Sequence, residues 1–178
     1  PCETFSFSGR DLLGGALAEI NNVVCRGVAR LLPDGRWDQG FDAQISSASY
    51  VAALALQPDG KVLVGGADVT GDPDGDPYGG LVRLRPDGGW DGTFAAPVGT
   101  MEGGPVIYAI ELQPNGKILV GGDFTDLHGV ARNGLARLQP PSGSNVHPTA
   151  EKLPRLQLAF PRVVRQANHQ RNVTWLRT

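Results

Sequence analysis

The chain has 178 residues, of which 40% are hydrophobic and 19% charged; this composition excludes a chain disordered throughout and allows one globular domain. Its net charge is −2, but residues 1–145 carry 10 basic and 17 acidic side chains, whereas residues 146–178 carry 6 and 1. No recognition motif accompanies the scattered basic residues, and no apolar run approaches the roughly 20 residues of a membrane span, so we expect neither a nucleic-acid partner nor a membrane span.

One motif recurs three times at a nearly constant spacing. A glycine, a basic residue, a short apolar run and a glycine pair are followed, after a loop, by a small apolar residue, an arginine and a leucine. The copies are residues 9–15 with 29–31, 60–66 with 82–84, and 116–122 with 136–138. The arginines are 53 and 54 residues apart, and such a period predicts a repeat architecture.

Each repeat is expected to open with an alternating strand. Residues 50–56 and 106–112 place apolar side chains at every other position, which predicts a β-strand. The side chains expected on one face are Tyr50, Ala52, Leu54 and Leu56, and in the third copy Val106, Tyr108, Ile110 and Leu112.

A tight turn then leads into a second strand. The turns read Gln-Pro-Asp-Gly (57–60) and Gln-Pro-Asn-Gly (113–116), in which proline fixes φ and glycine accepts a positive φ. Residues 61–64 and 117–120 are apolar on both faces, so we expect central strands covered on both sides. The glycine pairs that end these strands predict a bulge or a close approach of a neighbouring backbone. They are Gly65 and Gly66, and Gly121 and Gly122.

A third strand carries the recurring arginine, and a closing segment follows it. The third strand of the second copy is predicted at residues 81–84, and a Pro-Asp-Gly turn then leads to Trp-Asp-x-x-Phe, which begins at Trp37 in the first copy and at Trp90 in the second. Four short strands in about 54 residues, without a helical pattern, are typical of a β-propeller blade. A β-sandwich is the competing fold.

We therefore expect an all-β chain, a partial β-propeller of about three four-stranded antiparallel blades, with the outer two incomplete. The blades are expected at about residues 3–45, 46–98 and 99–143, and residues 144–178 form an irregular tail that could begin a further β-unit. A closed ring typically has four to eight blades. Because the chain begins at Pro1 and not at Met, we expect a fragment or a processed product. Missing blades of a parent protein, or self-association, would then complete the ring.

Three segments of the sequence resemble the bacterial delta-60 repeat family. They are residues 56–66, 81–88 and 90–94, and the resemblance covers roughly residues 5–143. The third copy departs from the pattern, because it loses the Trp-Asp-x-x-Phe segment. The family is described as a β-propeller domain of unknown function, so the resemblance implies this fold and an extracellular or cell-surface bacterial protein. It brings no activity and no catalytic residue.

Recurrence within one chain predicts a structural role for Arg30, Arg83 and Arg137. An unpaired buried charge is costly, so we expect each arginine in a buried or half-buried ion pair, with Asp38 or Asp91 of the closing segment as partner. Ligand binding by these arginines is the alternative.

The loop at residues 68–78 is the best candidate for chemistry. Asp72, Asp74 and Asp76 alternate, as the first three ligands of a calcium loop do. Pro77 stands where such a loop has glycine, and no glutamate closes it, so a solvated acidic turn is the alternative. His128, near two aspartates, is expected to be an exposed loop residue. Cys2 and Cys25 are expected either to form a disulfide or to stay unpaired.

The leading functional hypothesis is a non-catalytic repeat module of an exported bacterial protein, for protein or glycan interaction or as a scaffold. One alternative is a fragment of a propeller enzyme, a hydrolase or lyase with its site at the ring centre. The other is a calcium-stabilised surface spacer. No cofactor beyond this calcium is predicted.

Overall fold

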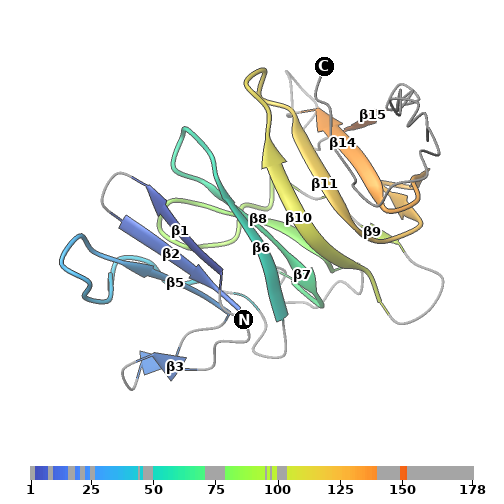
Figure 1. The fold of residues 1–178 in the computed structure, drawn as a ribbon. Coiled ribbons are helices and arrows are strands. Elements are labelled where there is room, and N and C mark those ends of the chain that lie inside the picture. Colours follow the sequence, from blue (N-terminus) through green and yellow to red (C-terminus); the bar gives the residue numbers. More distant parts are fainter. Residues whose placement is uncertain are drawn as a thin grey trace, which may run out of the picture.

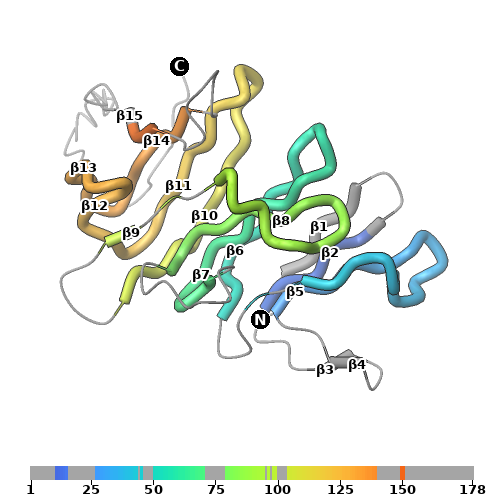
Figure 2. The backbone as a smooth tube through the Cα atoms, turned by 180° about the vertical axis from the view of Figure 1, so that it is seen from behind, coloured from blue at the N-terminus to red at the C-terminus, as the bar shows by residue number. Residues whose placement is uncertain are grey.

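The computed structural model describes residues 3–7, 10–15, 19–20, 23–24, 27–43, 45, 50–70, 79–94, 96, 98–99, 104–139 and 149–151. Every regular element among these residues is a β-strand, which confirms the expected all-β class. The strands form three antiparallel blades that lie side by side in the order of the sequence and do not close into a ring (Figures 1 and 2).

Blade 1 contains the first repeat. Its strands pair in the order β1-β2-β5, and a single bridge between Leu31 and Trp37 adds the closing segment. The loop between β2 and β5 carries a small hairpin, β3-β4. The bounds are β1 (Glu3–Phe7), β2 (Arg10–Gly14), β3 (Glu19–Ile20), β4 (Val23–Val24) and β5 (Val28–Leu31).

Blade 2 contains the second repeat and has the same order. The central strand β7 pairs with β6 on one side and with β8 on the other, and a bridge between Leu84 and Trp90 adds the closing segment. Among the described residues, the expected fourth strand is therefore reduced to a single bridge in each of blades 1 and 2. The bounds are β6 (Tyr50–Leu56), β7 (Val62–Ala67) and β8 (Leu81–Leu84).

Blade 3 is the one in which a full fourth strand is described. Its order is β10-β11-β14-β15, and β15 comes from the segment that the sequence places after the repeats. One residue pair, Val106 with Ala67, joins the sheets of blades 2 and 3. The bounds are β10 (Val106–Leu112), β11 (Ile118–Asp123), β14 (Leu135–Gln139) and β15 (Thr149–Glu151), and a separate small sheet contains β9 (Val98–Gly99), β12 (Asp126–Leu127) and β13 (Val130–Ala131).

The first strands of blades 2 and 3 do not alternate strictly. A β-bulge shifts the register of β6 between Val51 and Ala53, and the same shift occurs in β10 between Ile107 and Ala109. Because the bulge inserts one residue, Val51 joins Leu54 against blade 1. Because Tyr50 alternates with Val51, the expectation that Tyr50 shares a face with Leu54 is wrong, and so is the equivalent expectation for Val106 and Ile110.

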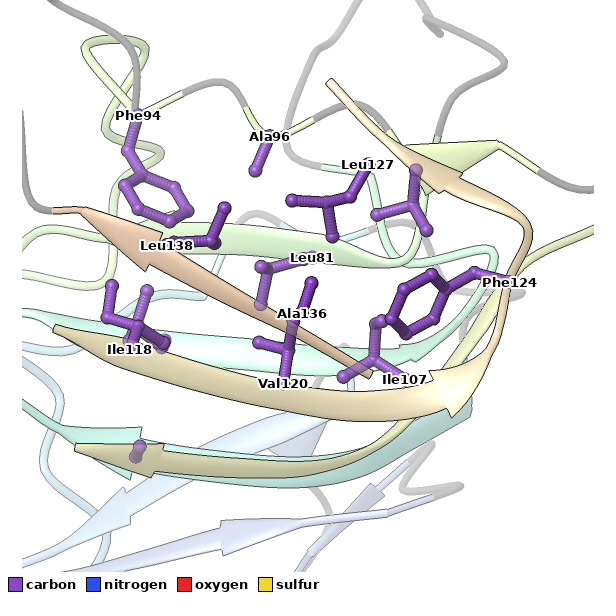
Figure 3. Close-up of a cluster of buried hydrophobic side chains, with 13 residues drawn as sticks. Leu81, Phe94, Ala96, Ile107, Ile118, Val120, Phe124, Leu127, Ala136 and Leu138 are labelled. Atoms are coloured by element: carbon purple, nitrogen blue, oxygen red, sulfur yellow. The ribbon is translucent and has the colours of Figure 1, made fainter. Parts of the chain in front are cut away.

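Two hydrophobic cores lie between the blades. The core between blades 1 and 2 includes Leu12 and Val28 on one side and Val51, Leu54 and Val62 on the other. The core between blades 2 and 3, shown in Figure 3, contains side chains of β7 and β8, of β10, β11 and β14, and of the segment after Trp90. A single blade cannot bury its own faces, so the burial of each face depends on the neighbouring repeat.

Candidate functional site

The recurring arginine of blade 2 is held in a buried polar cluster. Arg83 Nε donates to Asp91 Oδ2 at 2.9 Å, and both side chains are 7% exposed. Arg83 Nη2 also donates to Thr93 Oγ1 at 3.2 Å. The Arg83 guanidinium lies 4.6 Å from the centroid of the Phe94 ring, within the range of a cation–π interaction.

Asp91 also forms an ion pair with Lys61 and accepts hydrogen bonds from Thr93. Lys61 Nζ lies 3.2 Å from Asp91 Oδ2, and the backbone N–H and hydroxyl of Thr93 donate to Asp91 Oδ1. Burial raises the pKa of Asp91, but the Thr93 hydroxyl, the charge of Arg83 and the ammonium of Lys61 outweigh it and lower this pKa to about 2. A carboxylate with such a pKa is a poor proton acceptor near neutral pH, so the cluster suits a structural role.

Blade 1 repeats this arrangement and links it to the next blade. Arg30 Nε donates to Asp38 Oδ2 at 2.8 Å, and the Arg30 guanidinium lies 4.6 Å from the Phe41 ring centroid. Arg30 Nη1 donates to the carbonyl oxygen of Pro86, in the turn of blade 2, at 2.6 Å. The ion pairs expected from the sequence are thus present in the first two repeats.

In blade 3 the fourth strand brings a different residue to the arginine. The register of β14 and β15 places Glu151 opposite Arg137, whereas the backbone N–H of Asp38 donates to the Arg30 carbonyl in blade 1. An acidic residue therefore occurs at the corresponding backbone position of each blade. No sequence pattern predicts this position of Glu151, because β15 lacks the Trp-Asp-x-x-Phe segment.

The second glycine of each pair permits the bulge. A Cβ on Gly66 would overlap the carbonyl oxygen of Tyr50, and one on Gly122 would overlap that of Val106. Both predicted features of this pair, the bulge and a close backbone approach, are present. The first glycines, Gly65 and Gly121, face the neighbouring-blade side and differ from each other, as described below.

The closing tryptophans and the phenylalanines that follow them support the cluster. Trp37 and Trp90 are half-buried and pair with the ends of β5 and β8. Phe41 and Phe94 are each 1% exposed and stack on the arginines. Sequence reasoning missed this stacking and the role of Lys61. The signal was present, because the phenylalanine follows the aspartate by three residues in both copies that have the closing segment, and a basic residue follows the first glycine of the motif in all three copies.

The predicted calcium ligands Asp72, Asp74 and Asp76 lie outside the described residues, as do Cys2 and Cys25. Within the described part of the chain, no group of three or more histidine, cysteine, aspartate or glutamate side chains could hold a metal ion. His128 is half-buried and adopts a positive φ of 59°. Calcium binding therefore stays a prediction.

The loops between the second and third strands begin and end at equivalent backbone positions. A hydrogen bond closes each loop: Gly15 N to Gly27 O at 3.1 Å, Gly66 N to Gly80 O at 3.0 Å, and Gly122 N to Gly134 O at 3.0 Å. The loops of blades 1 and 3 carry small hairpins, β3-β4 and β12-β13. The loop of blade 2 is two residues longer. The blades thus present different loops from one constant framework.

Comparison with protein families gives a match in all three repeats. A family model described as "Domain of unknown function (DUF5122) beta-propeller" matches residues 9–41, 57–94 and 113–144, which is more than half of the chain. This agrees with the resemblance to the delta-60 repeat family. No curated protein matches the chain. Among the residues that the structure describes, no helix is long and apolar enough to cross a membrane.

Proposed function

We propose, since this chain belongs to the DUF5122 β-propeller family, that it is a non-catalytic repeat module that presents its loops to a protein or glycan partner. The observation that carries the proposal is the contrast between a constant framework and variable loops. Loops on a rigid scaffold are where binding residues concentrate.

The charged residues that recur in the framework support this proposal. Arg30 and Asp38 pair with each other, and so do Arg83 and Asp91. These side chains stabilise the blade and its contact with the next one. Binding specificity would then come from residues that differ between repeats, and these are concentrated in the loops closed at Gly27, Gly80 and Gly134.

A loop exchange tests the proposal. Residues 70–79 would be replaced by residues 125–133, because both segments lie between residues joined by an equivalent backbone hydrogen bond, Gly80 N to Val69 O and Gly134 N to Phe124 O, and because this exchange keeps the buried Val69. Binding to a glycan array and to an array of bacterial surface proteins would be measured for both chains. We expect the exchange to remove or redirect the binding of the native chain, at an unchanged thermal midpoint.

The matched control lies at the opposite end of the blades. Arg36→Ala removes an ion pair with Asp34 whose side chains are 78% and 49% exposed, which contributes little to stability. This variant should bind as the native chain does. Binding that survives the loop exchange but is lost in Arg36→Ala would contradict the assignment to the loops. Turnover of a bound glycan would contradict the non-catalytic role.

We also propose that the protein is exported to the cell surface or beyond, as the resemblance to the delta-60 repeat family implies. Antibody labelling of intact and of permeabilised cells of the source organism is the test. Labelling of intact cells at a level similar to that of permeabilised cells is expected. Labelling that requires permeabilisation would contradict export.

A further inference from the structure

The same packing device joins blade 1 to blade 2 and blade 2 to blade 3. In the first interface Val51 and Leu54 pack against Gly14, so closely that a Cβ on this glycine would lie 2.8 to 3.0 Å from their side-chain atoms. In the second interface Ile107 and Ile110 pack in the same way against Gly65, at 2.7 to 3.0 Å from such a Cβ. In blades 1 and 2 the missing side chain of this glycine leaves a slot on the blade face, called the glycine slot. The next blade fills the slot with two aliphatic side chains three positions apart.

The corresponding slot of blade 3, at Gly121, is open. Among the described residues, the atoms nearest to a Cβ built on Gly121 are the Ala109 Cβ and the Gly134 carbonyl oxygen, both at 3.9 Å and both from blade 3 itself. The register places Gly121 opposite Leu135 in β14, as Gly65 stands opposite Leu81 and Gly14 opposite Val28. The slot at Gly121 therefore occupies the same position in its blade as the two filled slots do in theirs.

The side chains around this slot are exposed where their equivalents are buried. Leu135 is 47% exposed, whereas Leu81 is 3% and Val28 is 1% exposed. Ala109 is exposed, whereas Ala53 at the equivalent position is 4% exposed. Tyr108 beside it is 58% exposed. This face of blade 3, around Gly121 and Leu135, is called the open face below.

We infer that the open face is the docking surface for one further blade of the same repeat type. The occupant would carry aliphatic side chains at the positions of Ile107 and Ile110 in its first strand, to fill the Gly121 slot. Its second strand would be aliphatic at the positions of Ile118 and Val120, which are both fully buried against blade 2. The argument is continuity, because two interfaces of this kind already exist in the chain, whereas no described strand packs on the third.

One polar residue on the open face is compatible with this occupant. Glu111 stands at the position of Ala55, which at 9% is the most exposed member of its core cluster. Glu111 is also one residue from the end of β10. Glu111 is exposed and stands near the end of the strand, at the rim of the face, where interfaces are commonly polar and wet.

The first blade of a second copy does not match the open face. The register of β1 and β2 puts Thr4 at the position of Leu54 and Ile110, and Asp11 at the position of Val62 and Ile118. Docking would bring an aspartate to a position that is buried in both existing interfaces, and burying an unpaired carboxylate is costly. The occupant is therefore a blade with a different sequence from blade 1.

The first experiment adds such a blade to the full chain. In a tandem variant, residues 84–137 occur twice in succession, which keeps the spacing of 54 residues between arginines. Leu135→Ala would then be placed in either copy. We expect the substitution in the first copy to lower the thermal midpoint by about 5 °C or more, because Leu135 becomes a core residue there. In the second copy, whose face stays open, the shift should be about 1 °C or less. Equally small shifts in both copies would overturn the inference.

A second experiment remains decisive if the tandem variant does not fold. Thr4→Leu combined with Asp11→Val places aliphatic side chains of blade 1 at the positions of Ile110 and Ile118, so this variant should self-associate head to tail in sedimentation experiments. Adding Gly121→Leu, which fills the slot, should restore the monomer. A monomeric double variant would overturn the inference. Self-association of the native chain that Gly121→Leu abolishes would also overturn the inference, because a second copy of the chain would then occupy the open face. Both experiments measure folding or self-association and not ligand binding, so their result is independent of the proposed loop function.

Discussion

Blades 2 and 3 share one motif and one strand register, yet they differ in what covers them. The four residues of β8 are all buried, whereas β14 has an exposed Leu135 and a half-buried Arg137. Blade 2 lies between two neighbours, whereas only one face of blade 3 packs against another described blade. The comparison teaches that the repeat motif specifies the blade, while the burial of its residues depends on the adjacent blade.

The largest difference is expected for the leucine that begins the third strand. Leu81→Ala should lower the free energy of unfolding by about 3–4 kcal/mol, because it leaves a cavity in the core between blades 2 and 3. Leu135→Ala should cost less than about 1 kcal/mol, because that side chain is half exposed. Chemical denaturation of both variants measures the difference. Equal losses would show that blade 3 is covered on both faces.

The arginines should show the next largest difference. Arg83→Ala leaves Asp91 buried with Lys61 as its remaining cation, and we expect a loss of about 3 kcal/mol. Arg137→Ala should cost about 1 kcal/mol, because Arg137 is half-buried on the open face. Arg83→Lys is the control that keeps the charge but loses the fork geometry and the stacking on Phe94. A loss for Arg137→Ala as large as that for Arg83→Ala would show that Arg137 is as strongly paired in blade 3 as Arg83 is in blade 2.

The first glycines of the pairs test the packing directly. Gly65→Ala would push a methyl group against Ile107 and Ile110, and such overpacking should cost about 2 kcal/mol. Gly121→Ala meets no described atom closer than 3.9 Å and removes a flexible residue from a strand, so it should be neutral or stabilising by about 0.5 kcal/mol. Thermal melting of the two variants is sufficient. Destabilisation by Gly121→Ala would mean that its slot is filled.

The smallest effect concerns pH and tests the Asp91 carboxylate of blade 2. The pKa of Asp91 is lowered from 3.8 to about 2, so its folded-state value lies below the unfolded one. Its contribution of roughly 2 kcal/mol is fully present above pH 4 and is lost as the pH falls through 2. In Asp91→Asn, the dependence of unfolding free energy on pH between 4 and 2 should be weaker by this amount. An unchanged dependence would assign the acid sensitivity to other carboxylates.

Several features of the site follow from short-range patterns, and others do not. The Arg83–Asp91 pair could be predicted because an arginine and an aspartate recur at a fixed separation of eight residues. The bulge at Ala52 could not, because Tyr50 to Leu56 reads as a regular alternation and the insertion becomes evident only when the partner strand is aligned. β15 was missed for a similar reason, since its pairing with β14 has no counterpart in the motif of the other two blades.

The repeat unit follows from the amino-acid sequence alone. Its turns, central apolar strands, glycine pairs and recurring ion-pair partners are local, and local chemistry suffices to place them. How one unit meets the next depends on the packing of whole blades. Ile107 and Ile110 fill the slot at Gly65, whereas no side chain of another described blade fills the slot at Gly121. Leu81 is buried and Leu135 is exposed, although the motifs around them are nearly the same. The physical reason is that burial is a property of two surfaces in contact, and the motif encodes only one of them.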